Sequence, residues 1–118
     1  MHELGVVIEI VNTVKKLCAE EGIERVHSIV LQVGEISSAI PRFLEECYPA
    51  AVDGSFMEDT TLVIETVPAN ALCKNCNRIY RILDNPQQNK SICPACLSEE
   101  TELLSGRELN IKEIVIPE

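Results

Sequence analysis

The chain has 118 residues, of which 46% are hydrophobic and 3% aromatic, and ten Lys and Arg against nineteen Asp and Glu give a formal net charge of −9. This length suits one compact core with a small additional lobe, and the negative charge with so few aromatic side chains disfavours binding to nucleic acid. No apolar run approaches the ~20 residues that a membrane-spanning helix needs, and the N-terminus lacks the pattern of a secretion signal, so we expect a cytoplasmic protein without a membrane partner.

The first predicted element is an amphipathic helix over residues 4–21. Its apolar side chains, including Cys18, recur at helical spacing, and Gly22 is placed to end it. The position of Cys18 on this stripe favours a small core residue over a reactive thiol. Residues 25–33 then alternate with period two, which predicts a strand that Gly34 closes.

A second helix is predicted to begin at Pro41, because proline suits the first turn of a helix. Cys47 lies on its apolar stripe, and Pro49 is expected to kink or end it. Residues 53–59 have the composition of a connecting loop. The β-branched residues of the run 61–67 predict a strand.

The segment 69–105 contains four of the six cysteines. Within it, residues 78–83 are predicted to form one arm of a hairpin, with its turn at 84–86. Residues 107–116 return to strand character. The apolar residues change face within this last run, which indicates either a bulge or burial on both sides.

The order of these elements predicts an α+β fold, in which two helices cover one face of a small three-stranded sheet. The last strand follows the cysteine-containing segment, which is therefore an insertion. We expect two domains: an α/β domain made of residues 1–68 plus 106–118, and an inserted zinc-ribbon-like domain made of residues 69–105.

The cysteine motifs are the strongest chemical signal in the chain. Cys73-Lys-Asn-Cys76 and Cys93-Pro-Ala-Cys96 are separated by sixteen residues, a spacing typical of a four-thiolate zinc site. Each short motif brings two thiolates to one side, and the spacer can fold one pair onto the other. Four thiolates leave no open coordination position, so the sequence predicts a structural Zn²⁺ bound by Cys73, Cys76, Cys93 and Cys96.

The N-terminal residues Met1-His2-Glu3 offer a second set of donors. The α-amine, the first peptide nitrogens and the imidazole of His2 can form chelate rings that suit a square-planar ion such as Ni(II) or Cu(II). These residues precede or begin a helix, where backbone N–H groups have no helical acceptor. The Glu3 side chain is equally well explained as an acid favoured at a helix N-terminus. A histidine at the second position is usually only an exposed residue, so this pattern alone is weak evidence for a metal site.

Several motifs together resemble one family. The opening Met1-His2-Glu3-Leu4, the strand end Val33-Gly34-Glu35, the two cysteine motifs and the closing run 105–109 are similar in order and spacing to the hydrogenase nickel-incorporation proteins of the HypA/HybF family. The resemblance implies a nickel metallochaperone that binds Ni(II) through the Met1 amine, the His2 imidazole and the backbone nitrogens of His2 and Glu3. It further implies that the protein works with the GTPase HypB, serves the large subunit of [NiFe]-hydrogenase, and in some organisms serves urease maturation.

Two other functional classes fit part of the sequence. A zinc-ribbon adaptor in transcription or RNA processing would share the cysteine motifs, but the basic and aromatic binding face expected of it is missing from the sequence. A metal- or thiol-dependent enzyme would need an open metal site or a nucleophile motif, and the sequence shows neither. We therefore expect that the chain is not an enzyme.

Overall fold

The computed structural model describes residues 2–85 and 91–118, and of His2 only the backbone. None of the helices within these ranges has the length and apolar character needed to cross a bilayer. The chain divides into two compact units. The first comprises Met1–Val33, Ser38–Glu65 and Leu109–Glu118, and the second comprises Gly34–Ser37 and Thr66–Glu108.

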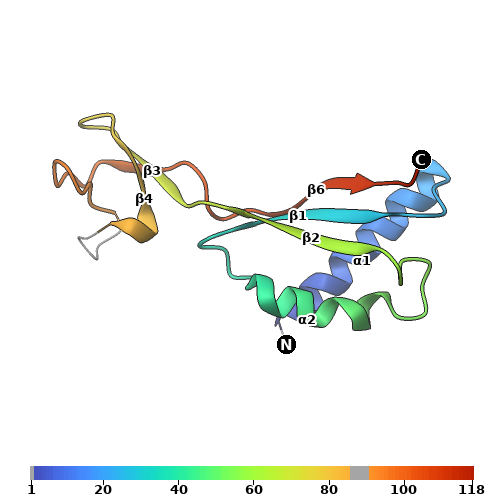
Figure 1. Ribbon diagram of the computed structural model, residues 1–118. Coiled ribbons are helices and arrows are strands. Elements are labelled where there is room, and N and C mark those ends of the chain that lie inside the picture. Colours follow the sequence, from blue (N-terminus) through green and yellow to red (C-terminus); the bar gives the residue numbers. More distant parts are fainter. Residues whose placement is uncertain (1, 86–90) are drawn as a thin grey trace. The chain divides into compact units, whose positions relative to one another are not determined.

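The first unit is built on a three-stranded sheet that has both helices on one face (Figure 1). The strands lie in the order β2-β1-β6. This arrangement confirms the predicted α+β class and the predicted side of the helices. The elements are α1 (His2–Glu21), β1 (Ser28–Gly34), α2 (Pro41–Val52), β2 (Thr61–Val67) and β6 (Leu109–Val115).

Strand β1 lies at the centre of this sheet. Thr61 N donates to His27 O at 3.0 Å and Glu35 N donates to Val67 O at 2.9 Å, so β1 and β2 run in parallel. Strands β1 and β6 are antiparallel, and their register shifts so that Lys112 is an extra residue on β6. The change of apolar face in the sequence therefore reflects a bulge, which is one of its two predicted explanations.

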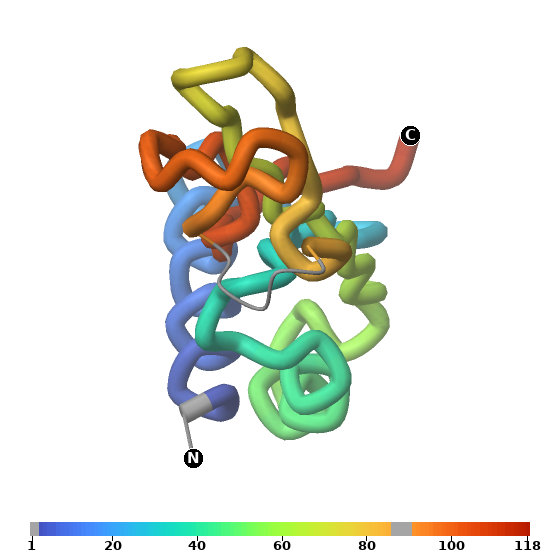
Figure 2. The backbone as a smooth tube through the Cα atoms, turned by 90° about the vertical axis from the view of Figure 1, so that its left-hand side faces the viewer, coloured from blue at the N-terminus to red at the C-terminus, as the bar shows by residue number. Residues whose placement is uncertain are grey.

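One hydrophobic core joins the helices to the sheet. Ile29, Leu31 and Val33 are fully buried, which shows that alternate residues of β1 face the helices. The helices lie side by side, with α2 seen nearly end-on in green beside the blue α1 (Figure 2). Their buried side chains recur at helical spacing and are Val7, Val11, Val14 and Cys18 on α1, and Leu44, Tyr48 and Val52 on α2.

Both helices extend beyond their predicted limits. Helix α1 begins at His2, two residues earlier than predicted, and α2 continues through Pro49 to Val52. The prediction that Pro49 could end the helix was wrong. Pro49 has no N–H to donate to the carbonyl of Glu45, four residues earlier. Both residues are exposed, so water can donate to this carbonyl instead. The buried side chains of Tyr48 and Val52 meanwhile hold the last turn against the core.

The opposite face of the sheet carries polar side chains that pair across all three strands. Gln32 Nε2 donates to Glu65 at 3.2 Å, and Asn110 Nδ2 donates to Gln32 Oε1 at 3.1 Å. Lys112 Nζ donates to Glu65 Oε2 at 2.9 Å, and this contact lowers the pKa of the Glu65 carboxyl. Cross-strand pairs of this kind suit a sheet face that is open to solvent.

The second unit contains a smaller antiparallel sheet in the order β4-β3-β5. Its strands are β3 (Asn70–Cys73), β4 (Ile79–Arg81) and β5 (Thr101–Leu103), and a 3₁₀ helix follows β4 at Ile82–Asp84. Part of the predicted arm 78–83 is therefore a strand. This strand pairs with β3, and the first cysteine motif forms the turn between them. The predicted turn at 84–86 was therefore wrong at residues 84 and 85, and residue 86 lies outside the described residues.

Three segments of the second unit cross closely at Gly34, Ala69 and Gly106. A methyl group at Gly34 would lie 2.0 Å from Gly106 O, and one at Gly106 would lie 2.5 Å from Ala69 Cβ. Gly34 N donates to Glu108 O at 2.8 Å, and Ile36 N donates to Gly106 O at 2.9 Å. Only glycine permits this approach, and Gly106 also has a φ of 120°, which favours glycine.

Candidate metal centre

The two cysteine motifs form the same tight turn. In the first motif, Cys73 N donates to Arg78 O and Asn77 N donates to Cys73 O, both at 2.8 Å. In the second, Leu97 N donates to Cys93 O at 2.9 Å. Asn77 and Leu97, the residues after the second cysteine of each motif, have left-handed φ values of 63° and 61°. Asparagine tolerates this conformation well, whereas for leucine it costs roughly 1–2 kcal/mol.

These turns bring the four cysteine sulfurs into one cluster. Cys73 Sγ lies 3.5 Å from Cys96 Sγ, Cys76 Sγ lies 3.7 Å from Cys93 Sγ, and all four sulfurs lie within 4.8 Å of one another. A tetrahedral ion with bonds of about 2.3 Å to sulfur places its ligands about 3.8 Å apart. The donor set and its spacing therefore fit a four-coordinate Zn²⁺.

The surroundings of the cluster favour thiolates at two of the positions. Asn75 Nδ2 donates to Cys96 Sγ at 3.5 Å, and this contact is the main reason that the pKa of Cys96 is lowered to about 6. Backbone N–H groups, first that of Cys96, lower the pKa of Cys93. The pKa of Cys76 is raised to about 11, because burial and the three neighbouring sulfurs together outweigh a backbone hydrogen bond that lowers it. Donors to sulfur also orient metal-bound thiolates.

Polar contacts that the sequence did not reveal support the second motif. Asn85 Nδ2 donates to Ile92 O at 2.7 Å, and Thr101 Oγ1 donates to Ser91 O at 3.1 Å. Both contacts join residues that are seven or more positions apart in the chain, so no local pattern could have indicated them.

Glu35 is a structural residue of the second unit whose contacts the sequence did not indicate. Its Oε1 accepts hydrogen bonds from Ala69 N at 2.8 Å and Arg81 Nε at 3.1 Å, and its Oε2 pairs with Arg81 Nη2. Only 9% of the Glu35 side chain is exposed. Arg81 and the Ala69 N–H lower the pKa of this carboxyl, so it is charged in the folded chain near neutral pH. The Val-Gly-Glu motif was the available signal, but its role was not apparent from the sequence.

The predicted nickel ligands lie at the start of α1. Met1 and the side chain of His2 lie outside the described residues. His2 and Glu3 are the first two residues of the helix, and Glu3 is half-buried. Their backbone N–H groups belong to the first turn, which has no helical acceptors for them.

Comparison with known proteins identifies the family. The sequence model described as HypA, hydrogenase/urease nickel incorporation, metallochaperone, matches residues 1–116. A hydrogenase maturation factor HypA from Streptomyces avermitilis is 35% identical over 115 residues, which cover 97% of this chain and 86% of that protein. Another, from Prosthecochloris aestuarii, is 31% identical over 116 residues, covering 98% and 99% of the two chains.

Two solved structures share the fold. The solution structure of a HypA protein has a TM-score of 0.70 at 19% identity and covers 99% of this chain and 97% of its own. That of the Ni metallochaperone HypA from Helicobacter pylori has a TM-score of 0.65 at 17% identity, with 97% and 96% covered. The match of the family model over nearly the whole sequence shows that this chain belongs to the HypA family of hydrogenase and urease nickel-incorporation metallochaperones.

Proposed function

We propose that this chain binds Ni(II) at its N-terminus and helps to deliver it to the large subunit of [NiFe]-hydrogenase, while a structural Zn²⁺ holds the second unit together. The observation that carries the proposal is the family match, which starts at residue 1 and includes both cysteine motifs. The protein would act as a carrier of its metal and would not be an enzyme.

Zinc is the ion that the cysteine cluster suits best. The four sulfurs lie within 4.8 Å of one another and come from a single compact unit. Four thiolates fill the coordination sphere of Zn²⁺, so a substrate or water has no position at which to bind. A closed site of this kind contributes to folding and keeps its ion, because releasing the metal would expose the thiolates and unfold the unit.

Nickel would be bound by different donors. We assign it to the Met1 amine, the His2 imidazole and the backbone nitrogens of His2 and Glu3, which together offer four nitrogen donors for a square-planar ion. The start of α1 at His2 supports this assignment, since deprotonating the first N–H groups of a helix breaks no helical hydrogen bond. Reprotonation of those nitrogens, or a change in their geometry on contact with the acceptor, would release the ion.

The two metals would therefore have separate tasks. A domain of residues 1–68 plus 106–118 would carry nickel, and a domain of residues 69–105 would carry zinc. The proposal places the protein in the cytoplasm, where thiols stay reduced. Its partners would be the GTPase HypB and the hydrogenase large subunit, and the urease maturation proteins where urease is also served.

Metal analysis of tag-free protein with an authentic Met1 tests this proposal. We expect about one zinc per chain as isolated, and one added nickel equivalent that is bound by the wild type and lost in His2→Ala. His27→Ala is the matched control, because His27 is the other histidine of the chain and is exposed directly before β1. It should keep the nickel.

The zinc assignment has its own pair of variants. Cys73→Ser should lose stoichiometric zinc, and Cys47→Ser should keep it, because Cys47 packs against the core of the first unit. If nickel binding persists in His2→Ala, the N-terminal assignment is wrong. Zinc without any His2-dependent nickel binding would instead favour a zinc-stabilised interaction module.

A further inference from the structure

Phe56 is an exposed aromatic side chain on the loop between α2 and β2. It is 47% exposed, whereas both tyrosines of the chain are buried. A hollow of about 340 Å³ lies beside it, lined by Phe56, three further apolar residues and two charged ones, which are Cys18, Ala19, Ile23, Lys15 and Glu24. A large apolar side chain next to a mostly apolar hollow is typical of a surface that binds a protein partner.

The loop that carries Phe56 is held in shape by its own contacts. Met57 is fully buried, so it anchors the loop in the core of the first unit. Met57 N donates to Ser55 Oγ at 3.1 Å. Gly54 N donates to Glu58 Oε2 at 3.0 Å. The loop therefore presents Phe56 in a fixed position, and a partner would not have to order it on binding.

The other wall of the hollow is the end of α1. Ile23 N donates to Cys18 O at 2.8 Å and Gly22 has a φ of 69°, as in a Schellman turn, which fixes Ile23 against the last turn of the helix. Glu20 and Glu21 lie in that turn, which contains no base. A helix C-terminus has a partial negative charge, so acids at this end are unfavourable for the chain alone. A positively charged partner would relieve this repulsion.

Acidic residues determine the charge of the partner. The segments 19–24 and 53–59 contain six acids and no base, and the acids are Glu20, Glu21, Glu24, Asp53, Glu58 and Asp59. All six are exposed, and none forms an ion pair within the described residues. The nearby bases are Lys15 in the hollow and Arg25 directly after Glu24. The first unit as a whole contains thirteen acids and five bases.

We infer that residues 19–24 and 53–59, the Phe56 surface, bind a positively charged segment of another protein. An apolar side chain of that segment would enter the hollow beside Phe56, and its Lys or Arg residues would pair with the surrounding acids. The negative charge excludes two other kinds of partner, because nucleic acid and anionic lipid would both be repelled.

The Phe56 surface is separate from the start of α1. The loop and the last turn of α1 lie at the same end of the first unit (Figure 1). Helix α1 has 20 residues, so its two ends are about 30 Å apart. A partner bound at the Phe56 surface would therefore leave the first residues of the chain free.

A synthetic peptide of Lys and Leu, titrated into the zinc-loaded and nickel-free chain, tests this inference. NMR amide shifts should map its binding to residues 19–24 and 53–59. Phe56→Ser should weaken the Kd roughly tenfold, because it removes the aromatic anchor. Glu24→Lys should also weaken it roughly tenfold, because an attraction becomes a repulsion. Both residues are exposed, so the variants should fold.

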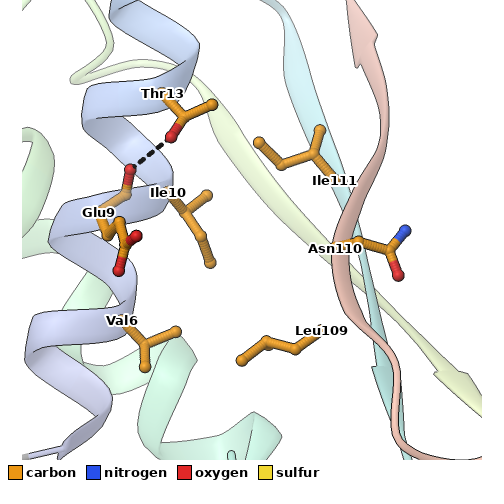
Figure 3. A pocket seen from close by; sticks show the side chains of 7 residues that line it. All are labelled: Val6, Glu9, Ile10, Thr13, Leu109, Asn110 and Ile111. Atoms are coloured by element: carbon orange, nitrogen blue, oxygen red, sulfur yellow. Dashed lines mark hydrogen bonds between the residues drawn. The ribbon is translucent and has the colours of Figure 1, made fainter.

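The groove between α1 and β6 supplies the matched controls. Glu9 and Leu109 line this groove, away from Phe56 (Figure 3). Glu9 is exposed like Glu24, and Leu109 is 37% exposed. Glu9→Lys and Leu109→Ser should therefore bind the peptide as the wild type does. The same peptide with Glu in place of Lys should not bind.

Three outcomes would overturn the inference. The first is that the Lys-Leu peptide does not bind the wild type. The second is that its amide shifts lie outside the Phe56 surface. The third is that Glu9→Lys weakens binding as much as Glu24→Lys does, which would show that net charge alone attracts the peptide.

Discussion

Replacing Gly34 with alanine should destabilise the folded chain by about 3 kcal/mol. The added methyl group would lie 2.0 Å from Gly106 O, whereas carbon and oxygen normally stay at least about 3.3 Å apart. The crossing would have to open by roughly 1 Å. The hydrogen bonds of Gly34 N and Ile36 N, now 2.8 and 2.9 Å long, would not survive that opening. Losing two buried hydrogen bonds at about 1 kcal/mol each, with residual strain of at least 1 kcal/mol, gives this magnitude.

Urea unfolding of the zinc-loaded protein, followed by circular dichroism, measures the effect. Gly5→Ala is the matched control because a methyl group there meets no atom of the described residues within 4 Å and the residue lies within α1. This change should stabilise the protein by up to about 1 kcal/mol, because alanine favours the helix. The two glycine-to-alanine changes should thus have opposite signs. A Gly34→Ala protein within about 0.5 kcal/mol of the wild type would show that the crossing does not exclude a side chain.

Three further predictions concern metal, pH and a buried hydroxyl. Chelating the metal under reducing conditions should unfold the second unit but keep the circular dichroism of α1 and α2, since the core of the first unit contains none of the four clustered cysteines; loss of all helical signal would contradict this. Arg81 lowers the pKa of Glu35 below its ordinary value of 4.5. The ionised Glu35 carboxylate therefore stabilises the folded chain above pH 4.5, and this stabilisation is lost as the pH falls through the lowered pKa that Glu35 has in the folded chain. Glu35→Gln should therefore be less stable than the wild type near neutral pH, by a margin that shrinks in acid, and a pH-independent margin would refute the role of this ion pair. Tyr48 Oη donates to Thr60 O at 2.9 Å in the core, so Tyr48→Phe should cost about 1–2 kcal/mol in urea unfolding, and a cost below about 0.3 kcal/mol would show that the bond contributes little.

The periodic segments of the chain were predictable because each face of such a helix or strand lies in one environment, either the core or the solvent. The strand over 61–67 and the start of the second helix at Pro41 match the structure. The fully buried Cys18 was identified from its place on the first apolar stripe. The convergence of the cysteines was also predicted, and their sulfurs lie within 4.8 Å of one another. Both kinds of prediction use spacings short enough to be read from local sequence.

Other features depend on contacts that no local pattern contains. Strands β3 and β5 have four and three residues, too few to show a period, and they are paired through the turns of the cysteine motifs. Helix α2 continues past Pro49 because packing of its buried face outweighs the local preference to stop. The pairing of Glu35 with Arg81 joins residues 46 positions apart. Long-range contacts of this kind are decided by the fold and not by neighbouring residues.

The position of β6 in the chain has a consequence for folding and synthesis. Strands β1 and β2 can assemble with both helices as soon as residue 67 is made, but the antiparallel neighbour of β1 follows only after the whole cysteine-containing segment. Contacts between such distant residues form slowly, since a long loop must close first. Until then β1 has an unpaired edge beside a hydrophobic core, which is a template for aggregation. Metal binding between Cys73 and Cys96 shortens that loop, so the supply of metal to the newly made chain would limit how long this edge stays exposed.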